Sequence, residues 1–503
     1  SSEAKTGARI KIDTPSLSGS FSTTGSKFDD LSLKNYDKTL DASDGKVIMF
    51  TPKGADHAAY VFDNWALSGT NAQNPGEFTQ WGLVSGDRLT PATPVVLQYE
   101  GDGFVVQREI SVDDKYLITL KDTVTNTSGA AISLVRSGAS RQHGLPEDLT
   151  NFFILQEGPI AIVDNTLVDM KYKKLAKKQT FTENGESGWA GLTDKYWLAA
   201  AIAPQGKQMA ANFRFTNIDG QDVYEAGYAL APTSISPGFS FESTGYIYAG
   251  AKRKDVLASY MDEKNQGIAR MDLAVDYGFL GLLTRPFSSA LSYFGKLTGN
   301  FGVGILLLTL ILKIILFPLN NKAYSSMAKM KALQPKMEKM KKRYGDDRMK
   351  LQQEMMAMYR KEGVSPVAGC LPMIPQMFIF FALYKSLFIT LEMRHAPFFG
   401  WIKDLSAKDP LSVLNLFGAL PWDPVPIAFL SFFAIGPLAL MYGISMAMMQ
   451  TLNTPPADKM QARIFQLMPL FFMFILAPFA AGLLVYWVWN NILSLIQQYF
   501  ITR

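Results

Sequence analysis

A long stretch near the end of the chain constrains the fold most: residues 464 to 500 include no charged side chain. One helix needs roughly 20 apolar residues to cross a bilayer, so this stretch is long enough for two short spans, and Pro478 and Gly482 favour a turn between them. Three more apolar stretches precede it. The sequence therefore predicts an α-helical membrane core of five spans, at about 301–319, 366–390, 426–449, 464–480 and 482–501.

The first half of the chain has a different composition. It is polar and charged throughout, and its apolar residues come in short runs separated by Gly, Asp and Asn, as in Val95–Tyr99 and Phe104–Ile110 around Gly101 and Gly103. Many short strands with such turns are typical of a β-sandwich. We therefore expect a multidomain membrane protein: an all-β expanded sandwich at 1–265, a linker with an amphipathic helix at 266–300, and the helical core at 301–503.

The amphipathic segment is predicted from apolar residues that recur every three or four positions after Pro286. A stripe of this kind favours a helix lying along the membrane surface, and a linker helix packed on the β domain remains the alternative. The stripe consists of Phe287, Leu291, Phe294 and Leu297.

Charge predicts the orientation of the core. Between Asn320 and Pro366 twelve Lys or Arg stand against five Asp or Glu, and loops rich in Lys and Arg stay in the cytoplasm. The β domain then lies on the other side, in the periplasm of a bacterial inner-membrane, multi-pass protein. Because the chain starts at Ser1 without a signal sequence, we expect a signal or anchoring span to precede it.

The same basic loop is expected to form a cytoplasmic helical hairpin at 321–362. Its apolar stripe is rich in Met, whose flexible side chains suit varied apolar partners, so the stripe is a candidate surface for client capture. The alternative is that the stripe packs on itself and the charge serves only topology. The stripe comprises Met327, Met330, Leu333, Met337, Met340, Met355 and Met358.

Lys313 is the main candidate for a functional residue. It lies inside the first predicted span, where a charge costs roughly 2.5–3.5 kcal/mol, and no predicted span offers an acidic partner at depth. A water-filled groove would lower that cost. The alternative is that its long side chain reaches the cytoplasmic interface. Candidate neighbours in the groove are Thr309, Gln376, Tyr486, Trp487 and Asn490.

No catalytic residues, metal site or cofactor is predicted. The chain has one cysteine, Cys370, and three histidines, His57, His143 and His395, and it lacks a phosphate loop or nucleophile elbow. We therefore expect a protein that is not an enzyme. A membrane transporter and a membrane-anchored carbohydrate-binding protein are the alternative functions.

Several segments of the helical half resemble the YidC family of membrane protein insertases. They include Phe317–Leu319, Ser326–Lys336, Gly345–Asp347, Gln353–Tyr359, Gly369–Met373, Leu391–Phe398 and Trp401–Pro410. The resemblance implies an insertase and chaperone with a hydrophilic groove open to cytoplasm and lipid, in which a basic residue, usually Arg, lies at the position of Lys313. It implies partners too: nascent membrane-protein clients, the Sec translocon, the ribosome and the lipid bilayer. The core is expected to be monomeric.

Overall fold

The structure is a computed structural model that describes residues 8–68, 76–150, 155–218, 220–345, 347–363, 373–420, 434–452 and 459–502. The chain forms two compact units, Ser1–Asp276 and Tyr277–Arg503. Parts of the predicted second and third spans, 366–372 and 426–433, lie outside the described residues, as does Cys370.

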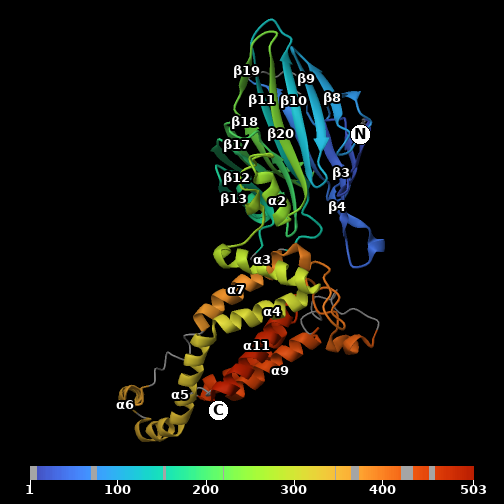
Figure 1. Ribbon diagram of the computed structural model, residues 1–503. Helices are drawn as coiled ribbons and strands as arrows, with labels where there is room; N and C mark the ends of the chain where they lie inside the picture. Colours follow the sequence, from blue (N-terminus) through green and yellow to red (C-terminus); the bar gives the residue numbers. More distant parts are fainter. Residues whose placement is uncertain are drawn as a thin grey trace. The chain divides into compact units, whose positions relative to one another are not determined.

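The first unit contains two β-sheets, which confirms the predicted all-β domain (Figure 1). The larger sheet has the order β14 (Thr180–Gly185), β17 (Met209–Ile218), β18 (Gln221–Leu230), β11 (Ile132–His143), β5 (Ala59–Leu67), β3 (Lys27–Asp37), β2 (Leu17–Ser22), β1 (Arg9–Asp13), β7 (Arg88–Leu89), with β19 (Thr233–Ile235) beside β11 and β4 (Lys46–Phe50) beside β3.

The smaller sheet is antiparallel and includes the strands predicted on either side of Gly101 and Gly103. Its order is β13 (Thr166–Asp169), β12 (Gly158–Val163), β15 (Gly188–Thr193), β16 (Trp197–Ile202), β20 (Ser240–Ala251), β10 (Leu117–Asn126), β9 (Phe104–Val112), β8 (Val95–Gly101), β6 (Gly82–Ser85). Short helices complete the unit: η1 (Ala42–Asp44), α1 (Tyr172–Lys178), α2 (Lys254–Met261) and η2 (Met271–Ala274).

Four charged side chains join the two sheets inside this unit. Arg108 and Asp122 belong to β9 and β10 of the smaller sheet, whereas Asp63 and Arg136 belong to β5 and β11 of the larger one. All four are 0–1% exposed. Arg108 donates to Asp122 at 2.7 and 2.8 Å and to Asp63 at 3.0 Å, and Arg136 donates to Asp63 at 3.0 Å. The two positive and two negative groups compensate each other.

Further hydrogen bonds satisfy the carboxylates of this cluster. Tyr228 donates to Asp63 at 2.5 Å, and Trp65 donates to Asp122 at 2.8 Å. Burial alone would raise the pKa of Asp122, but Arg108 and Arg136 outweigh it and hold the pKa below its ordinary value. Removing one charge would leave the others uncompensated in a dry interior, which is far more costly than losing an exposed pair.

The first unit ends later than the predicted boundary at residue 265. Helix η2 belongs to it, because Met271 and Ala274 are buried. The indole of Trp189 donates to the carbonyl of Ala269 at 2.9 Å, and the Asp276 carboxylate accepts from the backbone of Gln156 at 2.8 Å. These contacts tie residues 266–276 to the sheets, although the sequence there reads as a linker.

The second unit is helical, as predicted. Its helices are α3 (Gly281–Thr298), α4 (Phe301–Ile315), α5 (Phe317–Tyr344), α6 (Arg348–Lys361), α7 (Met373–Ile389), η3 (Leu391–Met393), η4 (Val413–Gly418), α9 (Pro437–Leu452), α10 (Lys459–Leu476) and α11 (Ala481–Thr502). Helix α11 packs against α4, α5 and α9. Among the described residues no helix on its own is long and apolar enough to span a bilayer, whereas α4 and the start of α5 meet that criterion as a bent pair.

The predicted first span, 301–319, is interrupted. The chain bends by 65° between α4 and α5, with Leu316 at the junction and Pro318 within the first turn of α5. Proline lacks the backbone N–H that would continue a helix and clashes with the preceding turn. Lys313 therefore lies in the last turn of α4 and not in the middle of a straight helix.

A segment between α7 and α9 holds the start of α9 through one carboxylate. Asp409 accepts from the indole of Trp401 at 3.0 Å and from the backbone N–H of Leu411 at 3.2 Å. Its second oxygen accepts from the backbone N–H of Leu438, in the first turn of α9, at 3.1 Å. The first N–H groups of a helix have no partner within the helix, so Asp409 acts as a cap from a distant part of the chain.

We predict that Arg136→Met destabilises the β unit by about 3–5 kcal/mol, because it leaves Asp63 with one cationic partner in a buried site. The matched control is Arg253→Met, since Arg253 is 47% exposed and pairs with an exposed Asp255; it should cost less than about 1 kcal/mol. Urea unfolding of the full chain, monitored through the protease resistance of the β unit, measures the loss of stability in both variants. Equal urea midpoints of unfolding for the two variants would contradict the prediction.

We predict that Asp409→Ala lowers the thermal stability of the helical unit by about 1–2 kcal/mol, the usual cost of losing a helix cap. Glu392→Ala serves as control, because Glu392 is exposed and accepts one long hydrogen bond, from Ser292 at 3.4 Å. Melting curves followed by helical circular dichroism should separate the two variants. A midpoint for Asp409→Ala that matches the control would show that α9 needs no cap from this segment.

Candidate functional site

A pocket in the helical unit surrounds Lys313. It holds about 200 Å³ of space outside the atoms, its open mouth included. Helices α4, α7 and α11 supply most of its wall, and Leu316 at the end of α4 completes it. The lining residues are Thr309, Leu312, Lys313, Leu316, Gln376, Ile379, Leu383, Tyr486 and Asn490.

The Lys313 ammonium is held by a neutral partner. Its Nζ donates to the hydroxyl of Ser494 on α11 at 2.7 Å, and Ser494 in turn donates to the carbonyl of Asn490 at 2.8 Å. Lys313 forms no ion pair with any residue in the part of the chain that the structure describes. An unpaired cation in a largely apolar surrounding is costly unless water or an anion reaches it. The pocket has room for about one water molecule and is open on one side.

Five of the six predicted groove residues line this one pocket. Thr309 is buried and donates to the carbonyl of Ile305 at 2.7 Å. Gln376 donates to the hydroxyl of Tyr486 at 3.4 Å, which links α7 to α11. Asn490 is half-buried beside them. The wall thus combines a hydroxyl, two amides and a phenol with four aliphatic side chains, so it can solvate a polar segment next to an apolar one.

Trp487, the sixth predicted groove residue, does not line the pocket. Its ring stacks on Phe380 at 5.5 Å between centroids and contacts Phe479 at 5.7 Å and Tyr442 at 5.9 Å. These contacts join α11 to α7, to α9 and to the residues that follow α10. Successive residues of a helix point in different directions, and here Tyr486 faces the pocket whereas Trp487 faces the aromatic side chains.

The hairpin stripe packs largely on itself. Leu333 on α5 and Tyr359 on α6 form a buried pair, and the Tyr359 hydroxyl lies 3.5 Å from the sulfur of Met337. Four methionines pack around this pair: Met330, Met337, Met355 and Met358. Met340 is half-buried outside the cluster, and the side chain of Met327 lies outside the described part of the structure.

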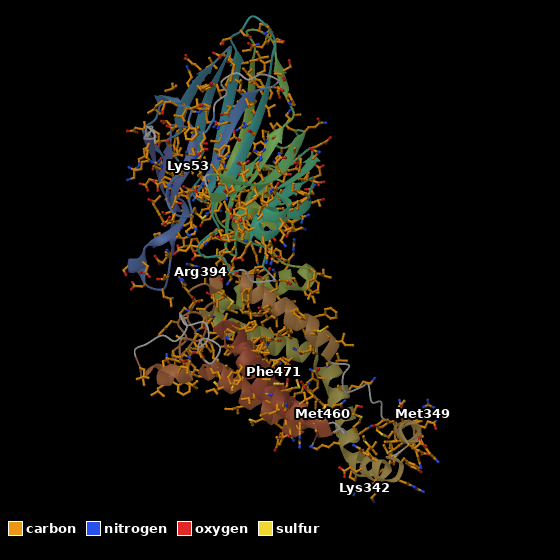
Figure 2. All side chains as sticks on the ribbon, turned by 180° about the vertical axis from the view of Figure 1, so that it is seen from behind. Lys53, Lys342, Met349, Arg394, Met460 and Phe471 are labelled. Atoms are coloured by element: carbon orange, nitrogen blue, oxygen red, sulfur yellow. The ribbon has the colours of Figure 1, made fainter. Side chains whose placement is uncertain are left out.

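Other methionines of the hairpin are exposed. Met349 is 76% exposed and Met356 is 42% exposed, both on α6. Figure 2 shows Met349 and Lys342 at the end of the hairpin that lies away from the remaining helices of the unit. The hairpin therefore offers an exposed apolar side chain beside basic ones, in addition to its internal cluster.

Two residues that support the pocket were not predicted from the sequence. Ser494 follows Asn490 by four positions, so both lie on one face of α11. This spacing in the sequence could have placed Ser494 near the predicted groove residue Asn490. Asn320, buried at the start of α5, approaches Gln497 of α11 at 3.5 Å. Asn320 follows Lys313 by seven positions, a spacing that places both residues on one side of a helix.

Comparison with known families identifies both halves of the chain. Residues 9–290 match the family model described as the YidC periplasmic domain, and residues 293–503 match the model described as 60Kd inner membrane protein. The membrane protein insertase YidC of Maricaulis maris is 47% identical over 98% of this chain and 84% of that protein. The YidC of Bradyrhizobium diazoefficiens is 42% identical over 98% of this chain and 82% of that protein.

A crystal structure of an active YidC insertase with its first transmembrane domain resolved is 17% identical, with a TM-score of 0.40 over 99% of this chain and 93% of that one. The relatives and the two family models, which together span nearly the whole sequence, confirm the resemblance noted from the motifs. This chain belongs to the YidC family of membrane protein insertases.

Proposed function

We propose that this insertase receives the polar tail of a client protein in the pocket around Lys313, while the client's apolar segment passes into lipid. The observation that carries the proposal is the hydrogen-bonded but unpaired Lys313 ammonium in a pocket with polar and aliphatic walls. A pocket of this kind lowers the cost of bringing polar groups among apolar helices. Burial of the client's apolar surface, at about 25 cal/mol per Å², drives the transfer.

The topology that we propose follows the charge pattern. The family consists of inner-membrane proteins with a periplasmic domain, and in this chain the β unit is that domain. The core would cross the membrane five times, with the basic hairpin α5–α6 in the cytoplasm. Helix α3 would lie along the periplasmic membrane surface, because Leu282, Tyr293 and Leu297 are exposed on it.

The proposed clients are nascent membrane proteins, which reach the pocket from the hairpin. The basic residues of α5 and α6 suit attraction to ribosomal RNA or anionic lipid, so the ribosome is a proposed partner. The Sec translocon is a second one, with the insertase acting beside it or alone as a monomeric core. No step of this scheme requires a cofactor.

Capture by the hairpin requires its internal cluster to open. Met330, Met337, Met355 and Met358 contact one another or the Leu333–Tyr359 pair in the structure, so a client's apolar segment would replace those contacts. Methionine favours such exchange, since its side chain adapts to different apolar shapes.

We predict that Lys313→Ala and Lys313→Glu lower insertion of a client with a short acidic tail, Lys313→Glu by about tenfold or more because it repels the tail. Lys313→Arg should retain activity. Lys322→Ala is the matched control, as Lys322 is an exposed lysine near the start of α5. Insertion into proteoliposomes that contain this protein as the sole insertase measures the effect. Full insertion by both Lys313→Ala and Lys313→Glu would show that charge attraction plays no part.

We predict that Leu333→Asp, which places a charge in the cluster, increases protease cleavage of the hairpin and reduces photocrosslinking to a nascent client severalfold. Met349→Asp changes an exposed residue and should leave both measurements near wild type. The opposite pattern, normal crosslinking with Leu333→Asp and a loss with Met349→Asp, would mean that clients bind the exposed surface of α6 and that the cluster stays closed.

A further inference from the structure

The hydroxyl of Ser494 is hydrogen-bonded both as a donor and as an acceptor. It is 3% exposed, donates to the carbonyl of Asn490 at 2.8 Å, and accepts from the Lys313 ammonium at 2.7 Å. A serine hydroxyl has one donor and two acceptor positions, so with its proton on Asn490 it is free to accept from Lys313. Ser494 thus links α4 to α11 at the pocket.

This contact restrains a side chain that would otherwise be mobile. The four-carbon stem of lysine allows its ammonium to reach a nearby membrane interface, and Lys313 lies in the last turn of α4, next to the bend. A neutral partner on α11 offsets part of the desolvation cost of the ammonium without neutralising its charge. An acidic residue at position 494 would instead form an ion pair and remove the attraction for an incoming anion.

The ammonium keeps capacity for a ligand. Lysine carries three N–H donors, and Ser494 accepts one of them. No other described residue accepts from Lys313, which leaves two donors for a group in the pocket. Two polar lining residues, Thr309 and Gln376, already donate to the Ile305 carbonyl and the Tyr486 hydroxyl. Lys313 is the one charged residue among the residues that line the pocket. A carboxylate, with two acceptor oxygens, matches that pair.

We propose that Ser494 is a positioning residue that holds the Lys313 ammonium in the pocket and thereby makes insertion selective for client tails that carry a carboxylate. The inference rests on the proposed function and adds a selectivity element to it. Ser494 acts through Lys313 and does not contact the client. Its loss should therefore affect the preference for acidic tails and spare the insertion of neutral ones.

The experiment compares two clients that differ only in Asp or Asn in their short tails, inserted into proteoliposomes by the full chain. The wild type should favour the Asp tail, and Ser494→Ala should reduce that preference roughly tenfold, the size expected for one hydrogen bond to a charged group. Ser494→Thr, which keeps the hydroxyl, should restore the preference.

Ser445→Ala is the matched control. Ser445 is a buried serine on α9 that accepts from the Asn491 amide at 3.0 Å, so its removal costs a comparable hydrogen bond away from Lys313. It should leave the preference between tails at the wild-type value. A Ser494→Ala variant that keeps the preference, or that loses insertion of both clients equally, would overturn the positioning role.

The proposed function can be judged separately. If Lys313→Ala shows the same preference between tails as the wild type, charge attraction at the pocket is wrong. If Lys313→Ala loses the preference and Ser494→Ala keeps it, the function stands and the role of Ser494 is refuted.

Discussion

An ammonium group among apolar helices must be solvated, hydrogen-bonded or neutralised, and this constraint organises the helical unit. Lys313 is hydrogen-bonded by one serine and has no ion pair among the described residues, so the surrounding helices leave space beside it. Thr309, Gln376 and Asn490 supply polar groups to that space, and aliphatic residues supply the rest. A fully apolar packing of α4, α7 and α11 would be tighter, but it would isolate a charge at a cost of several kcal/mol.

In the β unit, by contrast, the buried charges are neutralised by other side chains of the protein. Its four buried charges form a neutral set of two arginines and two aspartates, with Tyr228 and Trp65 as additional donors. Because every charge there has a partner, the set ties the two sheets together and has no capacity left for a ligand. Buried charge thus holds the two sheets together in the β unit, and in the function proposed above it receives a client in the pocket. The difference is whether the protein itself supplies the counter-ion.

The sequence predicted the fold class and most of the pocket because these depend on local patterns. Alternating burial along β9 is visible in the sequence, and so is a lysine within an apolar run. Contacts between distant residues were not accessible in this way. Arg108 occupies an inward position of β9, but its partner Asp63 is 45 residues away, and nothing local pairs them. The sequence could not distinguish Tyr486 from Trp487, because the exact rotation of α11 decides which of two adjacent aromatic residues faces the pocket. Apolar residues continue past Leu316 in the sequence, so the predicted span included the position of the bend.

The bend after α4 has an electrostatic consequence. Peptide dipoles along a helix add up to a partial negative charge at its C-terminal end, which favours a cation within the last turn. Because α4 ends at Ile315, Lys313 lies within that turn. A straight helix through residue 319 would place the negative end farther from the ammonium and leave Lys313 beside backbone carbonyls already engaged in helical bonds. Helix α5 begins at Phe317, so the partial positive charge of its N-terminal end lies at the same junction, and the backbone stabilises the cation only to the extent that the 65° bend directs that end away from Lys313.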